Sequence, residues 1–315
     1  MRSIEPVFEL DAARAHWRTQ CVSLILDNRG LPGRKKDEPD IMISAYRLTD
    51  PLSPYKVLKR HLALIVQMAR RDIVGRYRGS FVGLLWSFFN PLLMLMIYTF
   101  VFGVIFKSRW NDQVTGHFAF AIILFAGLNV NSLFAECANR APTLIVENTN
   151  FVKKVVFPLE VLSWSTLGSA LFHLLISTVV LLVILFAVNG FVPWTIVLFP
   201  IVVACFLPFV AGTIWMLASL GVFLRDLKQA IGIITAALMF LAPILYPKEF
   251  IPERYRDWMY LNPLTVIVEA SQDVLIWGKQ PSWVHLGLYT LLACLFAWLA
   301  FVWFERSRKG FADVL

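Results

Sequence analysis

Four arginines precede a long uncharged stretch, and the chemistry that they support is the binding of phosphate groups. Arg70, Arg71, Arg76 and Arg78 lie close together, and the next charged residue after them is Lys107. A guanidinium group is planar and donates two parallel charge-assisted hydrogen bonds to a phosphate or diphosphate. The simpler alternative is that these charges only fix the orientation of the chain in a membrane.

Other kinds of chemistry have little support. The chain contains no GxxxxGK[ST] phosphate loop, so it does not bind ATP by that route. The five histidines lack ligand spacing and the four cysteines do not pair by spacing, which argues against a metal site or a disulfide framework. Glu136 and Glu160 are expected to anchor helix ends. His173 is expected to pack through hydrogen bonds, with a functional role left open. We therefore expect no catalytic residue, metal or cofactor in this chain.

The composition indicates a membrane protein. The sequence is 58% hydrophobic and 16% charged, whereas soluble domains average about 45–50% and about 25%. The uncharged run 79–106 is long enough for a bilayer, which takes roughly 20 residues to cross. Spans in lipid must be helices, because every backbone polar group needs an internal partner. We expect an all-α integral membrane protein with six transmembrane helices, at about 81–106, 118–138, 160–188, 193–224, 229–247 and 283–304.

The distribution of basic residues predicts the orientation. With six spans both termini lie on one side, and that side carries 23 of the 29 Lys and Arg residues. The positive-inside rule therefore predicts that both termini are cytoplasmic. The second span is the weakest, because Asn129, Asn131 and Ser132 interrupt it. Such residues are expected to face other helices or a cavity.

Three regions are expected along the chain. Residues 1–54 read as a polar cytoplasmic extension, unless Met42 is the native start. Residues 55–79 combine apolar residues at helical spacing with Lys and Arg on the other face, which predicts an amphipathic helix in the membrane interface. Residues 80–315 form the six-helix domain. Within it, "VIVEASQDVLIWG" (266–278) predicts a short re-entrant helix on the outer side, or a loop lying on the membrane.

The bend between the interface helix and the first span is also predicted in detail. Gly79 and Gly83 permit a sharp turn, and Ser80 is expected to cap the new helix. Asp72 is expected to pair with Arg76 one turn further on.

Five stretches carry a family resemblance. They are "RDIVGRYRGSFVGLLWSFFNPLLMLMIYTFVF" (71–102), "NFVKKVVFPLEVL" (150–162), "LRDLKQ" (224–229), "LAPILYP…IP…NPLT" (241–265) and "FADVL" (311–315). In this order they resemble permease subunits of ABC type-2 polysaccharide exporters, which move O-antigen, teichoic acid or capsular chains. The resemblance covers the chain from about residue 55 to its end.

The resemblance implies a homodimeric channel with one six-helix bundle in each protomer. Two copies of a separate cytoplasmic ATPase subunit would bind ATP and Mg, so this chain is expected to be a transport subunit and no enzyme. The implied substrate is a lipid-linked, O-antigen-like polysaccharide that crosses the bacterial cytoplasmic (inner) membrane from its cytoplasmic side. Membrane lipid is a further expected partner, and nucleic acid is not.

The resemblance also implies roles for particular residues. Two cytoplasmic loops would couple the chain to the ATPase, through Asn150, Phe151, Lys153, Lys154, Phe157, Arg225 and Asp226. The bend before the first span would meet the diphosphate end of the substrate, through Arg76, Arg78, Gly79, Val82 and Gly83. Val82 stands where the family has Leu.

Aromatic side chains suit a glycan path, because sugars stack on ring faces and such contacts tolerate sliding. The residues expected to line the channel are Trp86, Phe89, Tyr98 and Tyr246. The alternative is that aromatic residues of a membrane helix face lipid or the interface.

Other functions remain open at this point. Teichoic acid, capsule and a small amphiphile are alternatives to O-antigen as the exported substrate. A membrane-embedded glycan polymerase would need charged residues clustered inside the spans or a large catalytic loop, and a secondary transporter would need paired intramembrane charges or inverted repeats. Neither pattern is evident in the sequence.

Overall fold

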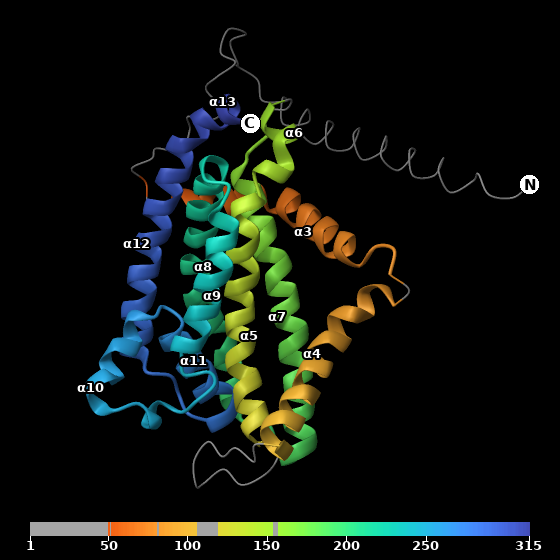
Figure 1. The fold of residues 1–315 in the computed structure, drawn as a ribbon, viewed down its shortest axis with the longest axis vertical. Coiled ribbons are helices and arrows are strands. Elements are labelled where there is room, and N and C mark those ends of the chain that lie inside the picture. Colours follow the sequence, from red (N-terminus) through yellow and green to blue (C-terminus); the bar gives the residue numbers. More distant parts are fainter. Residues whose placement is uncertain (1–49, 51, 81, 106–118, 154–156) are drawn as a thin grey trace, which may run out of the picture. The chain divides into compact units, whose positions relative to one another are not determined.

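The computed structural model describes residues 50, 52–80, 82–105, 119–153 and 157–315 (Figure 1). Every regular element in these ranges is a helix, which confirms the all-α class. The expected extension 1–54 and the loop 106–118 lie almost wholly outside the described residues. Among the expected site residues, only Lys154 lies outside them.

The elements follow one another along the chain with short connections. The α-helices are α2 (Ser53–Arg60), α3 (Leu62–Tyr77), α4 (Trp86–Tyr98), α5 (Ala119–Arg140), α6 (Thr149–Lys153), α7 (Glu160–Asn189), α8 (Phe199–Phe223), α9 (Leu227–Leu241), α10 (Glu253–Arg256), α11 (Thr265–Gln272), α12 (Trp283–Ser307) and α13 (Phe311–Val314). Between them lie single turns and π-helical segments: η2 (Gly83–Leu85), η3 (Thr99–Ile105), η4 (Ala141–Thr143), η5 (Val146–Asn148), η6 (Trp194–Leu198), η7 (Lys248–Phe250), η8 (Asp257–Leu261), η9 (Asp273–Trp277) and η10 (Arg308–Gly310).

Five helical stretches of the described residues are long and apolar enough to cross a bilayer, and each overlaps an expected span. They are Gly83–Phe102, Phe120–Thr143, Glu160–Asn189, Trp194–Phe223 and Trp283–Gly310. The remaining expected span, 229–247, is shorter than predicted, since α9 ends at Leu241. Ala242 precedes Pro243 and is extended, as residues before proline usually are. A sixth crossing therefore stays a prediction.

The end of α9 is satisfied by side chains from later in the chain. Asn262 Nδ2 donates to the Leu238 carbonyl at 2.8 Å, and the Tyr246 hydroxyl donates to the Phe240 carbonyl at 2.8 Å. The last carbonyls of a helix have no intrahelical partner. In lipid these bonds matter more than in water, because no solvent replaces them.

The central helix is α5, which packs against α7, α8, α9 and α11. Its apolar window is 83% buried. The side chains of Asn129 and Asn131 are buried as expected, whereas Ser132 is exposed. Figure 1 shows α5 between α9 and α7, in agreement with its contacts to both, so the buried Asn129 and Asn131 lie inside the bundle.

Close backbone packing joins α8 to its neighbours. A Cβ at Gly212 would lie 2.9 Å from the Ala297 Cα of α12, and a Cβ at Gly221 would lie 2.1 Å from the Pro142 carbonyl oxygen of η4. Trp215 of the same helix is buried and packs edge-on to Trp164 and Phe301. Small residues at these two crossings let the helices approach more closely than larger side chains allow.

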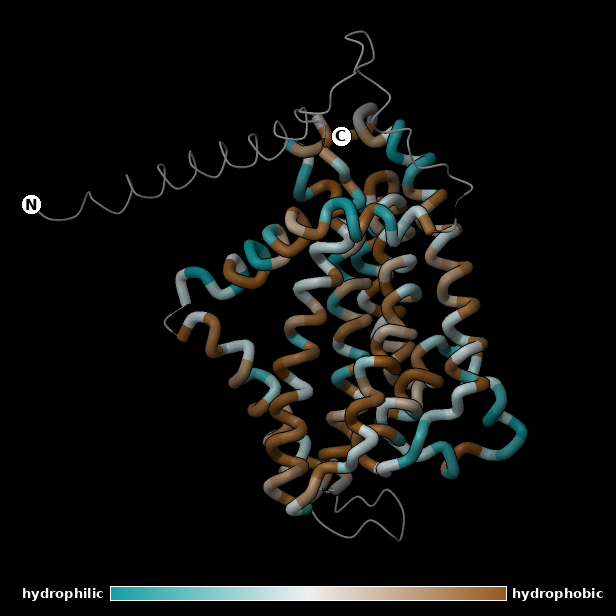
Figure 2. Tube along the Cα trace, turned by 180° about the vertical axis from the view of Figure 1, so that it is seen from behind, coloured by the Kyte–Doolittle hydropathy of each residue, from teal (hydrophilic) through white to brown (hydrophobic). Residues whose placement is uncertain are grey.

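The outer faces of the long helices are strongly apolar. Figure 2 shows hydrophobic residues along most of α4, α7 and α12. Only 11% of the window that contains α4 is buried, and residues such as Ile97 and Phe100 are more than half exposed. Exposed apolar surface on this scale suits helices whose surroundings are lipid or another apolar chain.

One end of the bundle is basic. The turn between α8 and α9, the segment α6, and the C-terminal elements η10 and α13 gather there, as Figure 1 shows and as the ring contact between Phe223 and Phe311 requires. We call this the basic end, after its exposed residues Arg225, Lys228, Arg306 and Lys309. The opposite end carries residues Lys248 to Trp277, which comprise η7, α10, η8, α11 and η9 and which we call the outer segment after the side predicted for it.

The expected helix 55–79 is two helices, because the chain breaks at His61 (φ −113°, ψ 21°). The second, α3, turns its apolar face onto α7. Its residues Ile65, Met68 and Ala69 are buried, and Ala69 Cβ lies 3.3 Å from where a Cβ on Gly168 would be. Part of the apolar face predicted to lie on the membrane therefore packs on protein.

Candidate functional site

Four side chains meet where α3 reaches α5 and α7, and we call them the α3 cluster: Arg76, Tyr77, Glu136 and His173. Arg76 Nη2 donates to Glu136 Oε1, and Arg76 Nη1 lies 3.2 Å from His173 Nδ1. The same imidazole nitrogen lies 2.9 Å from Glu136 Oε2, and the Tyr77 hydroxyl lies 3.4 Å from His173 Nε2. One carboxylate thus connects the end of α3 to two long helices.

A second ion pair reinforces the same junction. Arg140 Nη2 of α5 donates to Asp72 Oδ2 at 2.7 Å, while Arg71 approaches Asp72 at 3.4 Å. The predicted Asp72–Arg76 pair is wrong, since each partner is engaged with α5 instead. Glu136 lies near the C-terminal end of α5, as expected, and there it joins α3 to α7. His173 is hydrogen-bonded, as the packing interpretation predicted.

The α3 cluster is partly shielded from solvent. Burial is the main cause that raises the pKa of Tyr77 above its ordinary value, and the nearby Glu136 adds to the effect. Glu136 is 20% exposed and Arg76 is 41% exposed at their side chains. Because Arg76 already has a carboxylate partner, it is less available to an anionic ligand than a free arginine is.

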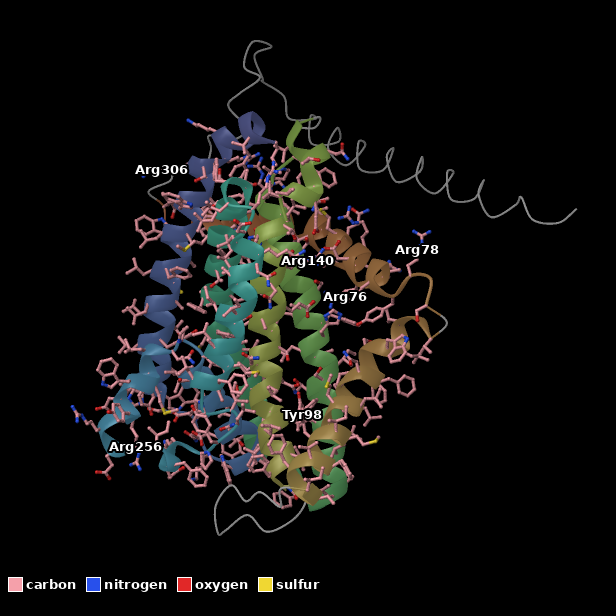
Figure 3. The ribbon with its side chains drawn as sticks, in the orientation of Figure 1. Arg76, Arg78, Tyr98, Arg140, Arg256 and Arg306 are labelled. Atoms are coloured by element: carbon pink, nitrogen blue, oxygen red, sulfur yellow. The ribbon has the colours of Figure 1, made fainter. Side chains whose placement is uncertain are left out.

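Arg78 lies beyond the α3 cluster and has a different environment. Its side chain is exposed and makes no hydrogen bond or ion pair within the described part of the chain. Figure 3 shows it pointing away from the bundle at the bend between α3 and α4, whereas Arg76 points toward α7. Of the two arginines expected to meet a substrate, Arg78 is the one with free donors.

The bend itself depends on two glycines. Gly79 and Gly83 have φ of 85° and 57°, in the left-handed region that favours glycine, and Val82 between them is half-buried. The expected Ser80 cap is wrong, because neither η2 nor α4 has a side-chain cap. The Ser80 hydroxyl instead accepts a hydrogen bond from Trp86 Nε1 at 3.0 Å. This bond joins the bend to the first turn of α4.

The aromatic residues expected to line a channel occupy two places. Trp86 and Phe89 are 42% and 41% exposed on α4, and Tyr98 is half-buried on the same helix. Tyr246 follows α9 and donates its hydroxyl to that helix. No ring contact in the described residues joins Tyr246 to the other three, so the single chain does not assemble them into one path.

The residues expected to couple to an ATPase gather at the basic end. Asn150 is exposed on α6, and the Phe151 ring stacks on the buried Phe157 ring, with centroids 4.6 Å apart. Arg225 and Asp226 are exposed at the turn between α8 and α9. Lys153 closes α6. The first loop and the second loop therefore lie at the same end, as a common docking face requires.

The contact that holds this region together was not predicted from the sequence. Arg308 Nη1 donates to Glu160 Oε1 at 2.9 Å, and Arg308 Nη2 donates to the Phe157 carbonyl at 3.0 Å. The partners are far apart in the chain, and no residue spacing points from one to the other. The one indication in the sequence was that Glu160, a charged residue, stands at the start of a long apolar run.

The outer segment carries its own polar contacts. Glu269 accepts a hydrogen bond from the Tyr260 hydroxyl at 3.2 Å and lies 3.5 Å from Lys248 Nζ. The carboxylate raises the pKa of Lys248. A neighbouring cavity of about 40 Å³, lined by Tyr260 and Asp273 among others, has room for water but none for a sugar ring.

One helix of the outer segment enters the bundle. The side chains of Ile267, Val268 and Gln272 on α11 are buried, and α11 packs against α5. A Cβ on Gly127 of α5 would lie 3.2 Å from Gln272 Nε2. The π-helical segment η9 follows α11 and leads to α12.

Comparison with known proteins identifies related sequences. Residues 63–276 match the family described as "ABC-2 type transporter". The chain is 29% identical over 258 residues to the O-antigen export system permease protein RfbA of Myxococcus xanthus, covering 81% of this chain and 96% of that protein. It is 26% identical to RfbA of Klebsiella pneumoniae (80% and 95% covered) and 25% identical to the polysialic acid transport protein KpsM of Escherichia coli (73% and 88% covered).

Proposed function

The chain belongs to the ABC-2 type transporter family, and from this premise we propose that it is the membrane subunit of an ATP-driven polysaccharide exporter. The observation that carries the proposal is the similarity to an O-antigen export permease over 96% of that permease. The substrate is a lipid-linked, O-antigen-like polysaccharide, moved outward from the cytoplasmic side of the bacterial inner membrane. The similarity to a polysialic acid transport protein supports a capsular glycan as the second candidate.

In this proposal the basic end faces the cytoplasm and both chain termini are cytoplasmic, as the positive-inside rule predicts. The chain crosses six times, with α9 and the residues up to 247 as the fifth crossing. Helices α2 and α3 lie in the interface, and α11 is a re-entrant helix on the outer side. The buried face of α11 and the satisfied end of α9 support these assignments.

The transport path is proposed to form between two copies of the chain. The largely unburied, apolar α4 supports an apolar partner beside it. Two ATPase subunits would bind ATP and Mg and contact α6 and the turn at Arg225 and Asp226. Arg78 would hold the diphosphate of the substrate near Gly79 and Gly83, and the aromatic residues of α4 would contact its sugars.

We expect ATP hydrolysis only when the chain is combined with its ATPase, because it lacks a phosphate loop of its own. The measurement is phosphate release in proteoliposomes from the purified chain, from the ATPase, and from both together. An ATPase whose phosphate-loop lysine is replaced serves as the control. Sustained hydrolysis by the chain without any ATPase would contradict the proposal.

Replacing Phe151 with Asp should prevent stable assembly with the ATPase. The substitution puts a charge on α6 in place of a half-exposed apolar ring, and apolar contacts supply most of the affinity of a docking face. The measurement is the amount of ATPase that co-purifies with the membrane-inserted variant. Phe151→Leu keeps an apolar side chain without the ring and should assemble. If Phe151→Asp retains the ATPase at the normal ratio, α6 is no docking element.

A further inference from the structure

The C-terminal turn holds two loops that lie far from it in sequence. Arg308 is only 15% exposed, and its guanidinium group divides its donors between the Glu160 carboxylate and the Phe157 carbonyl. Glu160 is 3% exposed at its side chain and is the first residue of α7. Arg308 therefore fixes the point where the chain leaves the first loop and begins a long helix.

That point is directly connected to α6. The ring of Phe157, whose carbonyl accepts from Arg308, stacks on Phe151 with an interplanar angle of 25°. A displacement of α6 would therefore move Phe157 through the ring contact, and Phe157 would in turn move Arg308 through the hydrogen bond to its carbonyl. Figure 1 shows α6 and α13 at the same end, and the two helices are in contact.

The second loop is held by the next residues. Phe311 is fully buried, and its ring packs against Phe304 of α12 and Phe223 of α8, with centroids 5.7 Å and 6.1 Å apart. Phe223 is the last residue of α8, and the exposed turn with Arg225 follows it. The same short segment thereby contacts the base of both loops.

We propose that Arg308 to Phe311, the C-terminal joint, ties both ATPase-facing loops to α7 and α12 so that they move together, and that Arg308 is the positioning residue. The inference rests on the proposed function for the identity of what moves the loops. The joint itself is a property of this chain alone. Arg308 suits the task because its planar fork engages two partners at once, which a lysine cannot do with fixed geometry.

A nearby carboxylate provides a matched control. Glu305 Oε2 lies 3.9 Å from Arg308 Nη1, too far for a hydrogen bond, and Glu305 is one turn away on α12. Glu305 also interacts with Glu160, and Glu305→Gln keeps the side-chain shape and a polar group beside Glu160 while leaving both hydrogen bonds of Arg308 in place. Arg308→Gln removes the charge and the fork, and so leaves the buried Glu160 carboxylate without its cationic partner.

The test is hydrogen exchange of the chain alone in lipid nanodiscs. In Arg308→Gln, amides of α6 and of residues 157–160 should exchange about tenfold faster, which corresponds to about 1.4 kcal/mol. Glu305→Gln should leave them unchanged, and Arg308→Lys should fall between the two. Unchanged exchange in Arg308→Gln, with the variant inserted and folded, would overturn the joint. A global rise over α5 and α8 would also count against it, as that indicates general unfolding.

Coupling is measured separately, with the ATPase present. Arg308→Gln should still assemble with the ATPase and hydrolyse ATP, but the ATP hydrolysed per exported chain should rise several-fold, with Glu305→Gln unchanged. If hydrogen exchange is faster but the ATP hydrolysed per exported chain is unchanged, the joint only stabilises the loops and its role in coupling is rejected. If no ATPase assembles even with the unmodified chain, the proposed function fails while the exchange result still decides the joint.

Discussion

Replacing Arg78 with Gln should reduce export about tenfold, while the chain still inserts and assembles normally. Arg78 is exposed at the bend and has no partner in the described residues, so its guanidinium group is free to hold a diphosphate. Hydrogen bonds to charged groups contribute roughly 1.5–3 kcal/mol, and about 1.4 kcal/mol is a factor of ten. The measurement is surface glycan together with lipid-linked glycan retained inside the cell.

Arg70→Gln is the matched control for this experiment. Arg70 is also exposed on α3, but it lies two turns before the bend. The same loss of charge there should change export little. Normal export by Arg78→Gln, with normal topology, would show that the arginines only anchor the chain. Equal loss in both variants would point to total charge and not to a binding site.

Replacing Gly221 with Ala should destabilise the folded chain by about 3 kcal/mol or more, at the upper end of overpacking costs. The added Cβ would lie 2.1 Å from the Pro142 carbonyl oxygen and 2.6 Å from the Pro142 Cα. These are backbone atoms, so no side-chain rotation relieves the overlap. The junction of α8 with η4 must separate. The measurement is the unfolding midpoint in detergent and the yield of folded protein.

Gly287→Ala provides the comparison, because Gly287 lies inside α12 with no atom within 4 Å of an added Cβ. Alanine is a better helix former than glycine by about 1 kcal/mol, so this variant should be as stable as the original chain or more so. A Gly221→Ala variant of unchanged stability would mean that α8 and η4 are not packed as closely as described.

The helical class could be predicted from the sequence because it follows from composition and run length. Membrane helices are long uncharged runs, and five of them overlap helical stretches of the structure. Helix α9 is shorter than the predicted span 229–247, since hydropathy alone continues through Leu245 whereas the helix ends before Pro243. The break at His61 had no such marker, as the surrounding residues all favour a helix.

The polar contacts were much harder to predict. The spacing of Asp72 and Arg76 allows a pair on one helix, but it cannot reveal that Arg140 and Glu136 of α5 lie within reach. Asp72 and Arg76 pair with α5 rather than with each other because these contacts also compensate charges that would otherwise be buried in α5. The same reason explains Arg308, whose role depends on a fold that brings its chain end to the start of α7. The position of Arg78 at the bend was predictable because Gly79 follows it directly, whereas its contact with a substrate stays a prediction.

The short length of α9 has a consequence for the lipids beside it. Its 15 residues rise about 22 Å, whereas the hydrocarbon core of a typical bilayer is about 30 Å thick. Ile233 and Phe240 are exposed on this helix, so in the proposed six-span topology the two leaflets would meet an apolar helix shorter than their hydrocarbon core. Such hydrophobic mismatch costs fractions of a kcal/mol for each ångström and is relieved by local thinning of the bilayer. We therefore expect membranes with shorter acyl chains to accommodate this protein best, and the thinned patch to shorten the barrier that a polar cargo must cross.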